Sequence, residues 1–203
     1  MRSLMVKPIH WGLMALICSL ALIGCSRGYT LRGSAITSPQ AAPDFTLTDH
    51  NGQPFRLSAQ KGKVVLIYFG FTSCPDACPT TLGNLARVRR DLGADAARVQ
   101  VVMVSLDPER DSAEVLKNYV TAFDATFLGL RGTQEELAPI LKAYGVTAIK
   151  RRLPDSALGY TIDHSVYTYV IDPAGRLRET FRTDSPTADI ASDVRYLIRK
   201  GDS

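Results

Sequence analysis

The stretch Val64-Val-Leu-Ile-Tyr-Phe-Gly-Phe-Thr-Ser-Cys74-Pro-Asp-Ala-Cys78-Pro79 decides the fold that the rest of the chain completes. Its first seven residues form an uninterrupted apolar run, as expected of a strand that is buried on both faces of a sheet. A helix is predicted from about Pro79 to Leu92, from the spacing of its leucines and valine. Cys74 and Cys78 therefore lie between a buried strand and a helix, where open α/β sheets bind their ligands.

Strand-like and helix-like stretches alternate around this unit. Turn residues at 49–52 and 172–175 each predict a hairpin, and the first of these is N-terminal to the buried strand. Asp111 is the expected N-cap of a helix, and Thr133 and Glu136 have the spacing of a capping box. The pattern indicates an α/β fold with a central mixed sheet, helices on both faces and an N-terminal hairpin. The expected strands are 45–48, 55–57, 64–70, 99–105, 165–171 and 176–181, and the further helices are 112–123, 133–144 and 187–199.

The first 24 residues have the build of a secretory signal peptide. Arg2 and Lys7 precede an uncharged apolar run from Trp11 to Ile23, and no acidic residue occurs before Asp44. The run of about thirteen residues is shorter than the roughly 20 that comfortably span a bilayer, so an uncleaved anchor is the weaker alternative.

The apolar run ends in Leu22-Ile-Gly-Cys25, which resembles the lipobox of bacterial lipoproteins. The resemblance implies that Cys25 is acylated and becomes the new N-terminus. We expect residues 1–24 to be the lipoprotein signal peptide, 25–42 a lipidated N-terminus and polar tether, and 43–203 the folded domain. The domain is then anchored by lipid to the cell membrane and faces the periplasm or extracytoplasmic space.

The composition fits one soluble globular domain, with 203 residues, 45% hydrophobic and 22% charged. Loss of Arg2 and Lys7 leaves 22 basic residues, of the original 24, against 20 acidic ones. Such a chain has no domain-wide basic excess with which to displace counterions from phosphates, so nucleic acid is not expected as a partner.

Cys74 and Cys78 become the two non-lipidated thiols of the processed chain, in a compartment that permits disulfides. Their spacing places both side chains about one turn apart on one helical face, and a helix N-terminus favours the thiolate form. A metal site and a redox pair both remain open. A purely structural disulfide is the weaker alternative, because so short a loop removes little entropy from the unfolded chain.

A third ligand must come from His50 or His164, the two histidines that remain after cleavage. His50 lies in a polar turn and is expected to be solvated. His164 directly precedes a predicted strand that can lie beside the strand leading to Cys74. Two thiolates and an imidazole suit Cu(I) and tolerate Cu(II), whereas Zn(II) asks for a fourth ligand or an open position. Asp163 is either an outer-shell group that orients His164 or an ordinary loop acid.

Three motifs, in this order, resemble the Sco (SenC) family: Phe69-Gly-Phe-Thr-Ser-Cys-Pro-Asp-Ala-Cys-Pro79, Asp107-Pro-Glu-Arg-Asp111 and Asp163-His-Ser165. The resemblance covers about residues 30 to 200 and implies a thioredoxin-like three-layer fold. It implies one copper ion held by Cys74, Cys78 and His164. Family members are implicated in assembling the binuclear copper centre of cytochrome c oxidase, and some are credited with thiol-disulfide reductase activity.

Two hypotheses follow from the motifs and the resemblance. In the first, the chain is a copper metallochaperone that hands its ion to the copper-accepting subunit of cytochrome c oxidase. In the second, Cys74 and Cys78 are the catalytic pair of an oxidoreductase that reduces that subunit's cysteines, with other copper carriers or thiol reductants as further partners. Residues 107–111 are interpreted as a loop exit with a helix cap, with a docking surface as the alternative. Storage of several copper ions is disfavoured, since the processed chain keeps a single methionine, Met103.

Overall fold

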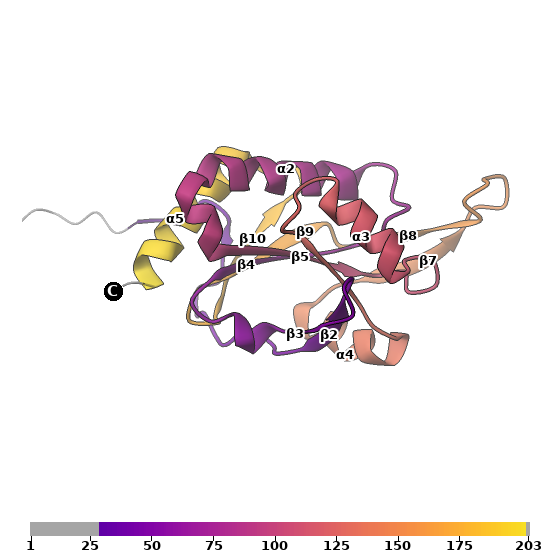
Figure 1. The fold of residues 1–203 in the computed structure, drawn as a ribbon, viewed down its shortest axis with the longest axis horizontal. Coiled ribbons are helices and arrows are strands. Elements are labelled where there is room, and N and C mark those ends of the chain that lie inside the picture. The colour runs from indigo at the N-terminus through magenta and orange to yellow at the C-terminus, as the bar shows by residue number, and fades with distance from the viewer. Residues whose placement is uncertain (1–28, 202–203) are drawn as a thin grey trace, which may run out of the picture. The chain divides into compact units, whose positions relative to one another are not determined.

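Strand β4 (Val64–Gly70) lies at the centre of the sheet, as its apolar sequence predicts (Figure 1). The computed structural model describes residues 29–201. All seven residues of β4 are buried, because β4 is flanked by β5 (Val99–Ser105) in parallel and by β9 (Tyr167–Ile171) in antiparallel orientation. Parallel and antiparallel pairing on the same strand makes the sheet mixed, as expected.

Within residues 29–201 the main sheet has eight strands in the order β1-β10-β9-β4-β5-β6-β2-β3. The N-terminal hairpin is present, with β2 and β3 paired antiparallel across the turn that contains Gly52. Strands β1 and β6 were not predicted from the sequence. The remaining strands of this sheet are β1 (Ser34–Ala35), β2 (Thr46–Asp49), β3 (Pro54–Arg56), β6 (Leu128–Arg131) and β10 (Leu177–Arg182).

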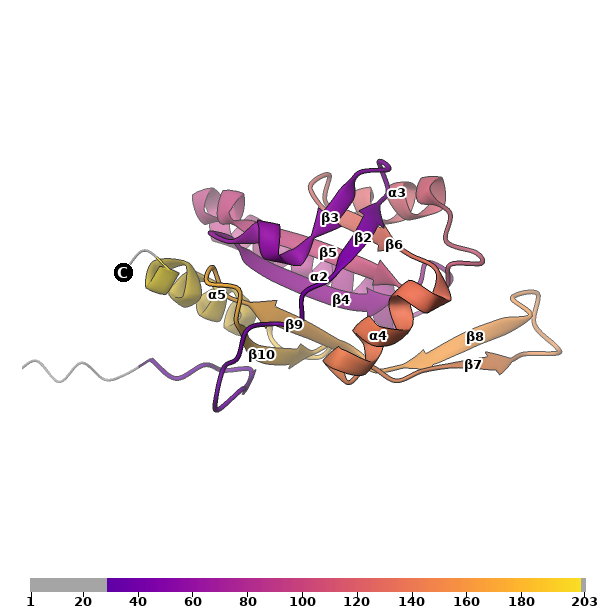
Figure 2. The same cartoon turned by 90° about the horizontal axis from the view of Figure 1, so that it is seen from below.

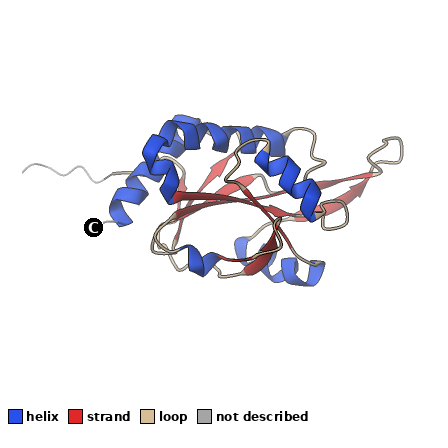
Figure 3. Ribbon diagram, in the orientation of Figure 1, coloured by secondary structure: helices blue, strands red, loops and turns tan. Residues whose placement is uncertain are grey.

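Helices cover both faces of the sheet, which confirms the predicted layers (Figures 1 and 3). Helices α2 (Ala77–Leu92), α3 (Ala113–Thr121) and α5 (Thr187–Gly201) lie over one face, and α4 (Gln134–Tyr144) lies over the other. Two short 3₁₀ segments complete the layers, η1 (Leu57–Gln60) and η2 (Gly93–Arg98).

The caps of two helices test the sequence reading directly. The capping box of α4 is present, since Thr133 Oγ1 accepts from Glu136 N–H while the Glu136 carboxylate accepts from Thr133 N–H. The cap predicted for α3 was wrong. Ser112, not Asp111, caps α3 and accepts from the N–H of Val115. Asp111 is fully buried and its carboxylate bonds to residues outside the helix. Aspartate and serine are both common N-caps, so the sequence pattern alone does not distinguish Asp111 from Ser112.

A second hairpin, which the sequence did not predict, projects beyond the main sheet (Figure 2). It consists of β7 (Ala148–Arg152) and β8 (Tyr160–His164), paired antiparallel with Ala148 opposite His164. Strand β7 is exposed along its whole length, so it lacks the alternation of apolar and polar residues by which strands are recognised. His164 is the last residue of β8.

Part of the segment expected to be a tether, residues 25–42, pairs with the sheet. The compact unit begins at Leu31, and Ser34 and Ala35 pair with β10 as its edge strand. The expected leader and the acylated Cys25 lie outside the described residues. Among residues 29–201, the structure has no helix of the length and apolarity that a membrane span requires.

Two buried carboxyl groups hold this N-terminal segment. Asp193 of α5 accepts from the backbone N–H of Arg32 at 2.6 Å and of Gly33 at 3.2 Å, and Glu179 of β10 accepts from Gly33 N–H at 3.1 Å. Gly33 is needed here, because a Cβ at this position would collide with the Glu179 carboxylate. Burial, followed by the neighbouring charge of Asp193, raises the pKa of Glu179 to about 8.

Replacing Glu179 with Gln is expected to flatten the pH dependence of stability between about pH 4.5 and 8. The folded protein keeps the Glu179 proton up to about pH 8, whereas the unfolded chain loses it near its ordinary value of 4.5. The free energy of unfolding of the wild type therefore falls as pH rises through this window, and this group lowers it no further above pH 8. Urea unfolding at a series of pH values measures the slope.

Glu114→Gln, on the exposed side of α3, is the matched control and should keep the wild-type slope. An equal slope in wild type and E179Q would show that Glu179 ionises alike in the folded and unfolded chain.

Candidate metal centre

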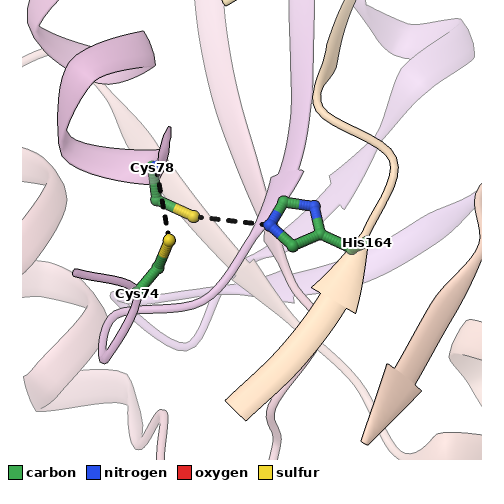
Figure 4. Close-up of side chains that lie close together, drawn as sticks. All are labelled: Cys74, Cys78 and His164. Carbon is green, nitrogen blue, oxygen red and sulfur yellow. Dashed lines mark hydrogen bonds between the residues drawn. The ribbon is translucent and has the colours of Figure 1, made fainter. Parts of the chain in front are cut away.

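Three side chains from distant parts of the sequence converge at the carboxyl end of β4 (Figure 4). The sulfurs of Cys74 and Cys78 and a ring nitrogen of His164 all lie within 4.8 Å of one another. Cys78 Sγ is 3.7 Å from His164 Nε2, and the Cys78 N–H points to Cys74 Sγ at 3.4 Å. Both cysteines are free thiols. In the described part of the chain this is the one cluster of three or more potential metal ligands.

The two cysteines occupy different positions in the loop and helix. Cys74 lies in the loop before α2 and is partly exposed, whereas Cys78 is the second residue of α2 and is completely buried. Gly70, the last residue of β4, makes room for it, since a Cβ there would lie 2.9 Å from Cys78 Sγ. In the sequence, the need for space beside Cys78 shows as a glycine between two aromatic residues, Phe69 and Phe71.

Strand pairing brings His164 to the cysteines. Because β9 runs antiparallel to β4, the start of β9 lies at the carboxyl end of β4, and His164 stands just before β9. The prediction that the strand after His164 lies beside the strand leading to Cys74 is confirmed. The imidazole packs edge-on against Phe71 and Tyr68, with ring centroids 5.8 and 6.1 Å away.

Asp163 does not contact the imidazole. Its carboxylate pairs with Arg151 across the hairpin at 2.7 Å, on the outward face, because neighbouring residues of a strand point to opposite sides. His164 Nδ1 instead faces the carbonyl oxygen of Ser165 at 3.0 Å. A carbonyl only accepts hydrogen bonds, so Nδ1 is the donor in this contact, and Nε2 is the ring nitrogen that faces the cysteines.

The two thiols are electrostatically unequal. The hydrogen bond from Cys78 is the largest cause that lowers the pKa of Cys74 to about 4, with a further contribution from His164. The same hydrogen bond, followed by burial, raises the pKa of Cys78. Tyr68, buried below, donates its hydroxyl to Cys78 Sγ at 3.4 Å. At neutral pH the pair therefore holds one thiolate, on the more exposed sulfur.

His50 is not solvated, which corrects the sequence reading. It is only 8% exposed, and its Nδ1 accepts the backbone N–H of Gly129 at 3.1 Å. Burial lowers its pKa. The turn is polar, but the neighbouring strand β6, which was not predicted, covers it. His50 therefore has a structural role and lies apart from the cysteines.

The donor set fits a soft metal ion. Thiolates favour soft ions such as Cu(I), imidazole is also a copper ligand, and a closed zinc site would need a fourth protein ligand. The Sγ–Nε2 separation of 3.7 Å is within the span of two ligands that each lie roughly 2.0–2.3 Å from one ion. The residues present thus suit copper without a rearrangement of the strands.

The fold and the site together define a thioredoxin-like protein whose Cys-x-x-x-Cys pair is joined by an imidazole. The family model for SCO1/SenC matches residues 34–199, and the chain belongs to this family. A SCO2-like protein from Rickettsia felis is 37% identical over 147 residues, which cover 72% of each chain.

Two solved structures have the same fold. The copper-bound structure of Bradyrhizobium japonicum ScoI is 37% identical, with a TM-score of 0.71 over 78% of this chain and 99% of that one. A SCO1/SenC family lipoprotein from Bacillus anthracis is 26% identical, with a TM-score of 0.68 over 83% of this chain and 99% of that one.

Replacing Cys78 with Ala is expected to raise the pH at which Cys74 is alkylated. The variant loses the hydrogen bond that contributes most to lowering the Cys74 pKa. In the wild type, the rate of Cys74 modification by iodoacetamide should be half-maximal near pH 4, and the variant's profile should move up by at least about one pH unit. Peptide mass spectrometry separates Cys74 from the other cysteines.

His164→Ala serves for comparison and should move the profile less, because the imidazole contributes less than Cys78. A C78A profile that stays near pH 4 would mean that Cys78 does not stabilise the thiolate.

Proposed function

We propose that this Sco protein carries copper and passes it to the copper-accepting subunit of cytochrome c oxidase, with Cys74, Cys78 and His164 as the ligands. The observation that carries the proposal is the convergence of two cysteine sulfurs that form no disulfide and a ring nitrogen of His164 on one small region. The copper-bound state of ScoI from Bradyrhizobium japonicum supports the choice of metal.

The geometry prepares the three groups to receive an ion. Cys74 supplies a thiolate before the ion arrives, and Cys78 gives up its proton on binding, so uptake should release protons. The Ser165 carbonyl engages His164 Nδ1, which leaves Nε2 as the ring nitrogen that faces the two sulfurs and can bind the ion. Copper, when bound, is the cargo, and its bonds to these three residues can be exchanged for bonds to ligands of the acceptor.

The site also favours handover to a partner. Cys74 and His164 are partly exposed, whereas Cys78 is buried beneath them. An incoming ligand of the acceptor can therefore replace the outer two donors first, while Cys78 holds the ion from below. A fully enclosed site would instead require the domain to open.

Thiol-disulfide exchange is the second candidate, and the Cys74 thiolate favours it. In this reaction Cys74 attacks a sulfur of the partner's disulfide, forms a mixed disulfide and displaces one partner thiolate. Cys78, once deprotonated, attacks Cys74, which releases the second partner thiol and leaves a Cys74–Cys78 disulfide. An external thiol reductant must then restore the pair.

Replacing His164 with Ala separates the two functions. Copper binding to the reduced full chain in detergent should weaken by more than about 100-fold, since even outer-shell partners of metal ligands contribute roughly 10- to 100-fold. Reduction of a model disulfide peptide should continue at a rate within about threefold of the wild type, because exchange uses only the two thiols. Competition with a chromophoric Cu(I) chelator measures the copper affinity. The rate of disulfide reduction is measured by quenching the reaction at set times and quantifying the thiols of the peptide.

His50→Asn is the matched control, because its amide oxygen can still accept the Gly129 N–H. It should bind copper as the wild type does. If the reduced wild type takes up no stoichiometric copper, or H164A binds it equally well, the metallochaperone proposal fails.

We further propose that Cys25 is acylated and anchors the domain outside the cytoplasmic membrane, with residues 26–30 as the remaining tether. The lipobox motif supports this, as does the lipoprotein relative from Bacillus anthracis. The six residues from Cys25 to Thr30 span at most about 20 Å, so the domain stays close to the membrane surface.

Replacing Cys25 with Ser is expected to move the protein from the membrane fraction to the soluble extracytoplasmic fraction or to leave the signal peptide uncleaved. Radiolabelled palmitate incorporation and fractionation measure the change. Cys18→Ser, inside the leader, is the control and should keep the label. Equal label in C25S and wild type would place the lipid elsewhere.

A further inference from the structure

The loop of residues 107–111, Asp107-Pro-Glu-Arg-Asp111, joins β5 to α3 and contacts both segments that carry the candidate ligands. Its side chains bond to the loop of Cys74 on one side and to the β7–β8 hairpin on the other. We infer that this loop is the positioning element that holds His164 over the cysteine pair, with Arg110 as the residue that acts on the histidine. This inference rests on the proposed copper site and deepens it.

On the cysteine side the contact is made by Asp111. Its carboxylate accepts from the Thr72 hydroxyl at 2.6 Å, from the Thr72 N–H at 3.2 Å and from the Ser105 hydroxyl at 2.6 Å. Asp111 is fully buried, so these bonds compensate the desolvation of its charge. Thr72 lies two residues before Cys74, and its N–H and hydroxyl are thus fixed to the end of β5.

On the hairpin side the contact is made by Arg110. Its Nη1 donates to the carbonyl oxygens of Leu158 at 3.2 Å and Tyr160 at 3.1 Å, and its guanidinium lies 3.7 Å above the Tyr160 ring. The Tyr160 hydroxyl donates back to Asp107 at 2.8 Å. The start of β8 is therefore fastened to the loop by backbone, stacking and side-chain contacts together.

Arg110 can affect the position of the imidazole through two sets of contacts. Tyr160 begins β8 and His164 ends it, and residues four apart on a strand lie on the same face. Phe71 provides the second route, because its ring centroid is 5.9 Å from the Arg110 guanidinium and 5.8 Å from the His164 ring. The hairpin projects from the sheet (Figure 2), and Arg110 holds it at Leu158 and Tyr160, at the turn end of β8. These contacts set the direction of the strand, whose other end is His164.

A loop that only began α3 would not need these residues. Ser112 already caps α3, and the side chains of Asp107, Arg110 and Asp111 all bond to groups outside that helix. Their contacts instead connect the two parts of the site, which are about 90 residues apart in sequence.

A double-mutant cycle with Arg110→Gln and His164→Ala tests the inference. We expect R110Q to weaken Cu(I) binding to the reduced full chain by about 10-fold, the scale of an outer-shell group. In the H164A background the same substitution should change affinity by less than about twofold, because a residue that acts through His164 has no effect once the imidazole is gone. Competition with a Cu(I) chelator gives all four affinities.

Amide hydrogen exchange of the metal-free protein provides a second readout. R110Q should accelerate exchange within residues 160–164, whereas Arg151→Gln, which breaks only the exposed pair with Asp163, should leave Tyr160 and Ile162 unchanged. Tyr160→Phe keeps the ring beneath Arg110 but loses the bond to Asp107, and it replaces R110Q in the cycle if that variant does not fold. Its expected loss of affinity is about threefold.

Equal losses of affinity in the wild-type and H164A backgrounds would overturn the inference, because Arg110 would then act through the cysteines or the fold as a whole. Unchanged affinity and unchanged exchange in R110Q would overturn it as well. If the wild type binds no copper, the proposed function fails, while hydrogen exchange in the metal-free protein still decides whether the loop positions β8.

Discussion

The burial of β4 between a parallel and an antiparallel neighbour is the constraint on which the rest of the structure depends. A strand with seven buried apolar residues must be covered on both faces and paired along both edges. Antiparallel pairing with β9 brings the start of β9 to the end of β4. Residues that precede β9 therefore meet residues that follow β4, and this single relation brings His164 together with Cys74 and Cys78.

The hydrogen bond from Cys78 to Cys74, together with the burial of Cys78, makes the two sulfurs different. Cys78 enters the core beside Gly70 and Tyr68, where a charge is costly, whereas Cys74 stays in the loop and holds the thiolate. One half of the pair is thus ready to react or to bind, and the other is protected until a partner or an ion arrives. Copper transfer and disulfide exchange both use this asymmetry, which is why a site of this kind supports two candidate functions.

Sequence reasoning failed where charged residues make contacts between distant segments. Asp111 fits the pattern of a helix cap, yet it binds Thr72 and Ser105, and Asp163 is adjacent to His164 in sequence but bonds to Arg151. His50 has polar neighbours in its turn but is covered by β6. For Asp111 and His50, packing supplied a partner that their neighbours in the chain did not indicate, whereas the exposed pair of Asp163 with Arg151 agrees with the ordinary loop acid, one of its two predicted alternatives. Hairpin β7–β8 was missed because its exposed first strand lacks any apolar period.

The sequence by itself determined the layers of the fold, the buried strand, the cysteine spacing and the one histidine placed before a suitable strand. These features depend on local patterns of apolar residues, turns and caps, which involve residues close together in the sequence. Only the tertiary structure decided which residues position the ligands, which sulfur is buried and where the N-terminal segment ends. The reason is physical: hydrogen bonds and desolvation depend on distances between segments, and the pairing of strands fixes these distances only when the chain folds.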